Sequence, residues 1–284
     1  MKEFMKTLLS IQSQVSFGAV GNTVTSMVAA QMDIPLAAIN TINLVAHPGY
    51  GIKAGGSLND TDFNSILAAI TKLNFWADIG VIATGYMAKQ QQVEAVSETI
   101  KIATSDHPHL PVLIDPAFGD HGRLYGDVAI ADAIRDLLLP LASITTPNRF
   151  EASWLTGMDI HDANDARHAA RHMLDQYPQL NTVIITGITP NTPNEGECLD
   201  IMQSRTGQDE HKAPLLTHHP HGFSGGGDLF AALLAAHIIT GHDMAAAFSR
   251  AATLTSAILQ HLDHHQQSDI TGLAIKSILS KLTS

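Results

Sequence analysis

Hydrophobic and polar positions follow two patterns along the chain. Short apolar runs, typical of buried strands, alternate with longer segments whose apolar residues recur every three or four positions, as on one face of a helix. Strands are predicted at Thr7–Ile11, within Pro35–Val45, and at Ile79–Ala83, Val112–Ile114, Ser143–Thr145 and Thr182–Thr186. Helices are predicted at about Asn22–Met32, Thr61–Leu73, Gln90–Ser105, Val128–Leu139 and Ala163–Gln176. This order is typical of parallel strands joined by crossover helices.

The pattern changes after Thr186. Glu197–Ser204 and Glu210–Leu216 are predicted to be two strands around a turn at Gly207, forming an antiparallel pair at the edge of the sheet. The remainder of the chain is mostly helical in pattern, and no repeat or Pro/Gly/Ser-rich linker divides it. We therefore expect one α/β domain over residues 1–284, a three-layer α/β/α sandwich around a mostly parallel sheet. Ligands of such sheets bind beyond the carboxyl ends of the strands.

Composition narrows the class of protein. Hydrophobic residues make up 45% of the chain and charged residues 15%, which indicates a folded domain with a large core. The balance of 16 Lys+Arg against 27 Asp+Glu gives a net charge of −11, which argues against nucleic acid or anionic lipid as a partner. The single cysteine, Cys198, cannot form an internal disulfide, and we expect it to be a small buried residue of a strand. A cytoplasmic protein without a signal peptide or membrane span is expected.

The sharpest motif is the run Phe223-Ser-Gly-Gly-Gly-Asp-Leu-Phe230, followed by an apolar helical stretch. Gly225, Gly226 and Gly227 let backbone N–H groups point inward, and a helix starting at Asp228 adds its positive end, so the motif predicts an anion hole. Asp228 has two interpretations. It is either an N-cap of the helix or a base that takes a proton from a hydroxyl attacking a bound phosphate.

Three further motifs follow predicted strands. Asp115 ends a strand in the segment Asp-Pro-Ala-Phe-Gly-Asp120, where it either holds Mg²⁺ through water or simply forms a turn. Asn148 and Glu151 are three residues apart at the start of a helix, the spacing of a capping box. The loop Ser10–Asn22 offers polar side chains to a small substrate, although its glycines are also those of an ordinary turn.

Several motifs are absent or weak. The chain contains no Gly-rich P-loop with its Lys, and the first loop lacks the spacing of a dinucleotide-binding fingerprint. The histidine clusters at 218–221 and 261–265 are interpreted as surface or loop residues, because adjacent histidines of a strand point to opposite faces. Trp76 and Trp154 are interpreted as packing residues.

Taken in order, the motifs resemble the ribokinase superfamily and, within it, the pyridoxal kinase family. The similar segments are SIQSQVSFGAVGN, DPAFGD, TPNRFEASWLTG and SGGGDLFAALLAA, spread over about Ser10–Gln260. The resemblance implies that Asp228 is the base for the substrate's hydroxymethyl group and that Gly225, Gly226 and Gly227 form the anion hole. It also implies that Ser13 contacts the pyridine ring.

The resemblance assigns further positions. Asp115 matches an acidic residue near ATP and its metal, and Asn148 and Glu151 match the pair that positions the phosphates and Mg²⁺. Asp120 and Thr146 match positions of a monovalent cation, K⁺ or Na⁺, and Thr186 matches an ATP contact at a strand end. Further expectations concern His47 and Tyr50 as substrate contacts, and Arg123 and Tyr125 in a loop that covers the phosphates.

Three departures from the family pattern are visible. Gly226 replaces a threonine of many relatives, Pro48 stands where many pyridoxal kinases have Thr, and Gly187 follows Thr186 where some relatives have a second hydroxyl residue. The second of these affects the substrate loop Val45–Gly51 and hence the choice of substrate.

The resemblance implies an ATP-dependent kinase that phosphorylates the 5′-hydroxymethyl group of pyridoxal, and also of pyridoxine and pyridoxamine, in vitamin B6 salvage, and that forms a homodimer. One alternative is a hydroxymethylpyrimidine or hydroxymethylpyrimidine phosphate kinase of thiamine synthesis, which needs the same phosphate site. Another is a noncatalytic vitamin-binding relative, and a weaker one is a nicotinamide-dependent dehydrogenase. Because Lys and Arg are few, phosphate binding is expected to depend on the glycine turn, the helix end and Mg²⁺.

Overall fold

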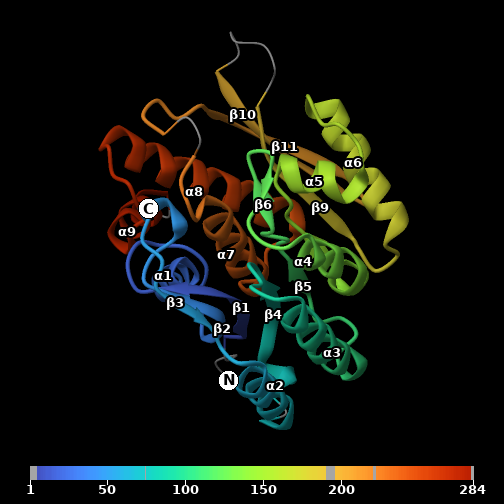
Figure 1. Cartoon of the computed structure of the whole chain (residues 1–284). Coiled ribbons are helices and arrows are strands. Elements are labelled where there is room, and N and C mark those ends of the chain that lie inside the picture. Colours follow the sequence, from blue (N-terminus) through green and yellow to red (C-terminus); the bar gives the residue numbers. More distant parts are fainter. Residues whose placement is uncertain (1–4, 74, 190–195, 220–221, 283–284) are drawn as a thin grey trace.

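The computed structural model describes residues 5–73, 75–189, 196–219 and 222–282. Its main strands are β1 (Thr7–Val15), β2 (Leu36–Leu44), β3 (Gly55–Ser57), β4 (Ile79–Thr84), β5 (Val112–Ile114), β8 (Ile144–Thr145), β9 (Thr182–Ile188), β10 (Glu197–Ser204) and β11 (Gln208–Pro214). They form a nine-stranded sheet in the order β11-β10-β9-β8-β5-β4-β1-β2-β3 (Figure 1). The strands from β9 to β2 in that order pair in parallel. The edge pairs β2/β3, β9/β10 and β10/β11 are antiparallel.

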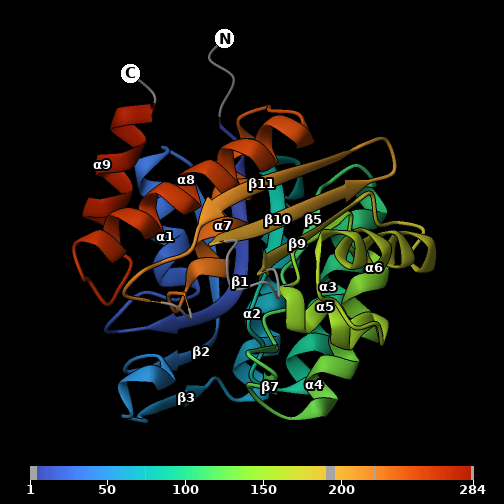
Figure 2. The ribbon, with the colours of Figure 1, turned by 90° about the horizontal axis from the view of Figure 1, so that it is seen from above.

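Helices cover both faces of this sheet, and Figure 2 shows the two groups on opposite sides. One group is α1 (Asn22–Gln31), α7 (Gly226–Ile239), α8 (Met244–His264) and α9 (Gly272–Leu282). The other is α2 (Asp60–Leu73), α3 (Gln90–Asp106), α4 (Val128–Ala133), α5 (Arg149–Thr156) and α6 (Ala163–Gln176). The predicted three-layer sandwich with a mostly parallel sheet is confirmed.

Successive residues of the central strands are buried in different layers. In β5, Val112 and Ile114 join the core under α2 to α6, whereas Leu113 joins the core under α1 and α7 to α9. Residues Leu9 and Leu8 of β1 divide in the same way. Because both faces of a parallel sheet are covered, its strands are apolar at nearly every position, which is why they were readable as short continuous runs.

The first strand is longer than predicted, because β1 continues past Ile11 to Val15. Polar Gln12 lies inside the fold without cost to the strand: its Nε2 donates to Ser10 Oγ at 2.9 Å and to Thr25 Oγ1 at 2.7 Å. Buried polar groups are tolerated when they are paired in this way. Ser13 therefore lies in a strand near its carboxyl end, and the loop begins at Ser16.

Other differences concern short or irregular elements. The predicted helix Val128–Leu139 is divided into α4, a π-helical turn at Ile134–Leu138 and a 3-10 turn at Leu139–Leu141, where Pro140 lacks the N–H that would continue an α-helix. The edge strand β3 and a small hairpin of β6 (Gly119–Asp120) and β7 (Arg123–Leu124) were not predicted, since they are too short to show a period.

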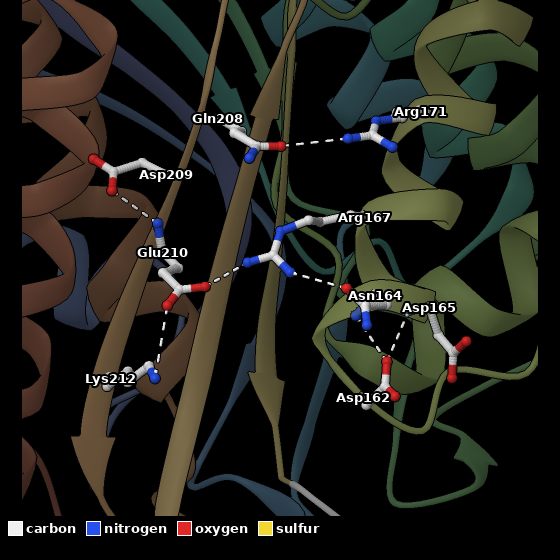
Figure 3. Close-up of polar contacts among 9 residues, drawn as sticks. All are labelled: Asp162, Asn164, Asp165, Arg167, Arg171, Gln208, Asp209, Glu210 and Lys212. Carbon is white, nitrogen blue, oxygen red and sulfur yellow. Dashed lines mark hydrogen bonds and ion pairs between the residues drawn. The ribbon is translucent and has the colours of Figure 1, made fainter.

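The antiparallel edge predicted after Thr186 is present, although β11 begins at Gln208 and ends at Pro214. Figure 3 shows Arg167 of α6 between Glu210 of β11 and Asn164 of its own helix. Lys212 Nζ lies 3.7 Å from the Glu210 carboxylate. Exposed ion pairs of this kind add little stability, but a charged edge strand discourages pairing with another chain.

Candidate functional site

The predicted site residues gather at the carboxyl ends of the parallel strands. Strands β1, β5, β8 and β9 run parallel, so the segments that follow them reach the same edge. The amino terminus of α7 contributes the glycine turn there, and α7 packs on α1 and on strands β1 and β4. The position is the one expected for ligands of an open α/β sheet.

The glycine turn is confirmed, with a correction to where its helix starts. Gly225 is the N-cap, with a φ of 87°, and α7 begins at Gly226, two residues before the predicted start at Asp228. Asp228 thus lies in the first helical turn and forms no capping hydrogen bond. Its Oδ2 instead accepts a hydrogen bond of 2.8 Å from the backbone N–H of Gly21. The capping interpretation of Asp228 is therefore wrong.

Gly21 was interpreted only as a turn glycine, and its contact with Asp228 could not be foreseen. A Cβ at Gly21 would lie 2.2 Å from the carbonyl oxygen of Ser13, so no other residue fits there without a shift of backbone. Burial raises the pKa of Asp228, while the Gly21 N–H lowers it in part. A carboxylate with a raised pKa and one fixed donor is suited to accept a proton near neutral pH.

Asp115 lies beside the glycine turn, as its motif predicted. Its side chain is buried, and its Oδ2 lies 3.9 Å from the position that a Cβ of Gly227 would take. Burial, and then the nearby carboxylates of Glu151 and Asp228, raise the pKa of Asp115 well above its usual range. Of two buried hydroxyls at strand ends, Thr146 interacts with the Asp115 carboxyl and lowers its pKa in part, whereas Thr84 Oγ1 has no hydrogen-bond partner among the described residues.

Asn148 and Glu151 form the predicted capping box of α5. Glu151 Oε1 also accepts from the N–H groups of Phe118 and Gly119 at 2.9 and 3.3 Å, and Asn148 Nδ2 donates to the carbonyl of Gly119 at 2.8 Å. Burial raises the pKa of Glu151 to about 8, against the effect of these backbone donors. The pair thus fixes the loop between Asp115 and the β6–β7 hairpin.

The other residues expected near the nucleotide or a monovalent cation range from half-buried to exposed. Thr186 is half-buried in β9, where its N–H donates to the carbonyl of Pro147 at 3.0 Å. Asp120 lies in β6, and its carboxylate accepts from the N–H of His121 at 2.7 Å. Arg123 is exposed in the hairpin, and Tyr125, just after it, is about half exposed. Partial burial of the Tyr125 phenol, and then four nearby carboxylates, raise its pKa.

Three residues were expected to contact the substrate. Ser13 is buried, and His47 and Tyr50 lie in the connection between β2 and β3. His47 caps a 3-10 turn, Pro48–Tyr50, and Pro48 is its first residue, a position that suits proline. Gly187, the third departure from the family pattern, has a φ of 72°, and its N–H donates to Asp200 Oδ1 at 3.0 Å. The left-handed backbone explains glycine at this position.

The histidine clusters do not form a metal centre in the part of the chain that the structure describes, where no three metal-ligating side chains are so arranged. His219 is partly buried and pairs with Asp263, and His221 lies outside the described residues. Cys198 lies in β10 as predicted, but it is half-buried, and burial raises its pKa to about 12. Trp76 is buried and Trp154 packs against the same core.

Comparison with known proteins identifies the family of the chain. A family model described as phosphomethylpyrimidine kinase matches residues 57–271. A pyridoxine/pyridoxal/pyridoxamine kinase of Bordetella bronchiseptica is 34% identical over 249 residues, which cover 86% of this chain and 85% of the relative. The chain belongs to the pyridoxal kinase family. A pyridoxal kinase of Rubrobacter xylanophilus is 29% identical over 89% of this chain and 86% of its own length.

Solved structures of pyridoxal kinases share the fold. The pyridoxal kinase of Leishmania donovani in complex with ADP and pyridoxine has a TM-score of 0.85 and 28% identity, covering 98% of this chain and 96% of that one. The same kinase with ADP and pyridoxamine has a TM-score of 0.84. Among the described residues, no helix is both long and apolar enough to span a membrane.

Proposed function

We propose that this member of the pyridoxal kinase family transfers the γ-phosphoryl group of ATP to the 5′-hydroxymethyl group of pyridoxal, pyridoxine and pyridoxamine. The observation that carries the proposal is the position of Asp228. Its carboxylate is fixed by Gly21 of the first loop, at the start of α7 and next to the glycine turn. A base is thereby held between a loop suited to the vitamin and a turn suited to phosphate.

The residues around Asp115 fit a divalent cation. Asp115 and Glu151 are buried carboxylates, the charge of Glu151 raises the pKa of Asp115, and the Thr84 hydroxyl has no hydrogen-bond partner among the described residues. Mg²⁺ is commonly held by one or two carboxylates and substrate phosphates, not by a complete protein cage. Asp115 would hold the ion, with Glu151 acting through water because its oxygens already accept three backbone N–H groups. The bound ion supplies neutralisation of phosphate charge.

The side chains and backbone groups of the site have separate roles in the proposed reaction. Ser13, His47 and Tyr50 orient the vitamin, and Asp228 takes the proton of its hydroxymethyl group as the oxygen attacks phosphorus. The N–H groups at the start of α7 stabilise the transferred phosphoryl group, because a helix leaves its first N–H groups unpaired. Asn148 and Thr186 contact the nucleotide. Most of the rate acceleration comes from orientation and electrostatics, as in other phosphoryl transfers.

Replacing the base tests the mechanism. Asp228→Asn keeps the shape of the side chain but cannot accept the proton, so we expect kcat to fall by about 10²- to 10⁴-fold with little change in the KM for ATP. Asp162→Asn, which alters the N-cap of α6, is the matched control and should keep wild-type kcat. Near-normal turnover of Asp228→Asn would remove Asp228 from the role of base.

A second substrate has a specific argument in its favour, since the matching family model is described as phosphomethylpyrimidine kinase. Hydroxymethylpyrimidine also presents a hydroxymethyl group on a nitrogen heterocycle. Steady-state assays with pyridoxal and hydroxymethylpyrimidine side by side would separate the two. We expect the higher kcat/KM for pyridoxal, and the reverse order would assign the protein to the pyrimidine substrate.

Two expectations accompany the proposal. Asp120 and Thr146 are proposed to serve a monovalent cation, which titration of activity with K⁺ and Na⁺ would test. The homodimer is likewise a proposal, to be measured by light scattering at assay concentration.

A further inference from the structure

The loop between α8 and α9 contacts both the glycine turn and the connection between β2 and β3. Ile270 is buried, and its Cδ1 lies 3.4 Å from the position that a Cβ of Gly225 would take. The preceding residue, Asp269, faces the opposite way, toward the connection between β2 and β3. One short segment thus packs on the phosphate turn and also contacts the vitamin side.

The Asp269 carboxylate has several partners there. Tyr50 donates its phenolic hydrogen to Oδ2, and Ser268 Oγ donates to the same oxygen at 3.0 Å. His47 Nε2 lies 3.7 Å from Oδ1. His47 Nδ1 accepts from the N–H of Gly49 at 3.2 Å, so a neutral ring carries its hydrogen on Nε2, the nitrogen that faces Asp269.

The first loop closes this cluster from the other side. The Phe17 ring meets the Tyr50 ring edge to face, with centroids 5.3 Å apart. A Cβ at Gly18 would lie 2.9 Å from Asp269 Oδ1 and 3.3 Å from Tyr50 Cε2, so a larger residue would displace the carboxylate. Asp269 therefore lies where three segments distant in sequence meet.

We propose that Asp269 is a positioning residue that holds the segment of residues 45–54 against the first loop and so sets the affinity for the vitamin. The inference rests on the proposed function, because His47 and Tyr50 are taken to face the vitamin. Asp269 does not touch the substrate in this account. It acts through His47 and Tyr50, and ATP binding does not depend on it.

Kinetics of Asp269→Ala and Asp269→Asn test this role. Loss of a hydrogen bond to a charged group should raise the KM for pyridoxal by about tenfold in Asp269→Ala, with the KM for ATP within about twofold. Tyr50→Phe should raise the same KM, and the two changes combined should be less than additive, because they remove one contact. Asp243→Ala, a cap at the far end of α8, is the control and should leave both values unchanged.

A protease readout needs no turnover. Lys53 is exposed within the segment, and trypsin should cut after it about fivefold faster or more in Asp269→Ala than in the wild-type protein, while Asp243→Ala is cut at the wild-type rate. Unchanged cleavage and unchanged KM for pyridoxal in both Asp269 variants would overturn the inference. A wild-type protein that does not phosphorylate pyridoxal would instead overturn the proposed function, and the cleavage rates would still decide whether Asp269 holds the segment.

Discussion

The three glycines that precede Asp228 differ in the room that surrounds them. Gly225 has a φ of 87°, and a Cβ there would lie 2.3 Å from the carbonyl oxygen of Ala19. A Cβ at Gly226 would meet only Leu259 Cδ1, at 3.6 Å. The departure from threonine at Gly226 is therefore not imposed by lack of space.

This difference gives a matched pair of variants. Gly225→Ala should lower the free energy of unfolding by about 1–3 kcal/mol or more and reduce kcat/KM, because backbone strain moves the turn. Gly226→Ala should stay within about 0.5 kcal/mol of the wild-type protein and remain active. Thermal unfolding and steady-state kinetics of both variants measure this. Equal losses in the two would show that the turn tolerates no side chain at either position.

Asp115 should destabilise the protein when no cation is bound. Its pKa is raised on folding, by burial and by Glu151 and Asp228, so the folded state binds the proton more tightly than the unfolded state. The tighter proton binding stabilises the folded state fully at pH values below the unfolded pKa. This stabilisation is lost as pH rises through the folded pKa, where the buried carboxyl must ionise.

Asp115→Asn removes that effect. Without Mg²⁺ we expect the variant to be about 1–2 kcal/mol more stable than the wild-type protein at pH 8, with a smaller difference at pH 5, and to lose kinase activity. Denaturant unfolding at both pH values measures the difference. A variant that is less stable at pH 8 would show that the carboxylate is already compensated by the chain.

Sequence alone identified many of the candidate residues of the site. Asp228, Asp115 and the Asn148–Glu151 pair were readable because each stands in a short motif after a predicted strand or at a predicted helix start, and the two partners of the capping box are only three residues apart. Gly21 and Asp269 were not, because each acts through contacts more than 200 residues away along the chain. The capping interpretation of Asp228 could likewise be rejected only in the structure, where Gly225 is the N-cap and the Asp228 carboxylate accepts from Gly21.

At the scale of elements, α8 anchors the connection that leads from β11 to the glycine turn. Asp263 of α8 accepts the N–H groups of Thr217, His218 and His219 at 2.8–2.9 Å, and it also contacts His219 Nδ1 at 2.9 Å. The His219 ring stacks on Phe223, with centroids 4.1 Å apart. The order of the turn thus depends on a helix outside the site.

Asp263→Asn tests this anchor. Burial tends to raise the pKa of Asp263, but His219 and the three backbone donors together lower it to about 2, so the carboxylate stabilises the fold above the unfolded pKa of 3.8. The stabilisation is lost as pH falls toward 2. We expect a lower Tm at pH 7, a difference that shrinks near pH 2, and a higher KM for ATP.

Asp162→Asn is the control for Asp263, since Asp162 also accepts backbone N–H groups but belongs to α6 (Figure 3). It should lower the Tm without a change in the KM for ATP. A KM for ATP that is unchanged in Asp263→Asn would separate the anchor from nucleotide binding.

Elements with a long period were predictable within a few residues. Helix α6 was predicted at its observed bounds because Asp162 caps it and its apolar residues keep one face. The short strand β3 and the β6–β7 hairpin were not predicted, because they owe their pairing to neighbours and not to their own pattern, whereas the short strands β5 and β8 were found as apolar runs. The polar end of β1 was missed for a related reason, since Gln12 finds its partners in Thr25 of α1 and in Ser10 of its own strand.

At the scale of the molecule, the net charge of −11 is compatible with nucleotide binding if the phosphates are held by backbone dipoles and a cation. The carboxylates of Asp115, Glu151 and Asp228 lie close together in the site, and no described Lys or Arg is paired with any of them. Nucleotide affinity should therefore depend strongly on Mg²⁺.

Calorimetry with a non-hydrolysable ATP analogue measures this dependence. We expect binding with Mg²⁺ to be about 5- to 150-fold tighter than binding with EDTA, the usual range of coupling between two ligands. The dependence should be smaller in Asp115→Asn and unchanged in Asp162→Asn. Equally tight binding with and without the metal would contradict the electrostatic account.

The hydrogen bond from Gly21 to Asp228 joins residues 207 positions apart, and it has a consequence for biosynthesis. A nascent chain that has emerged only through β9 already holds the strand ends and their carboxylates, but it has neither the glycine turn nor the proposed base, Asp228. Contacts of such long range form slowly, because the intervening loop must first be closed. The proposed kinase activity therefore requires α7 to pack on α1, and we expect chains that end before Asp228 to be inactive.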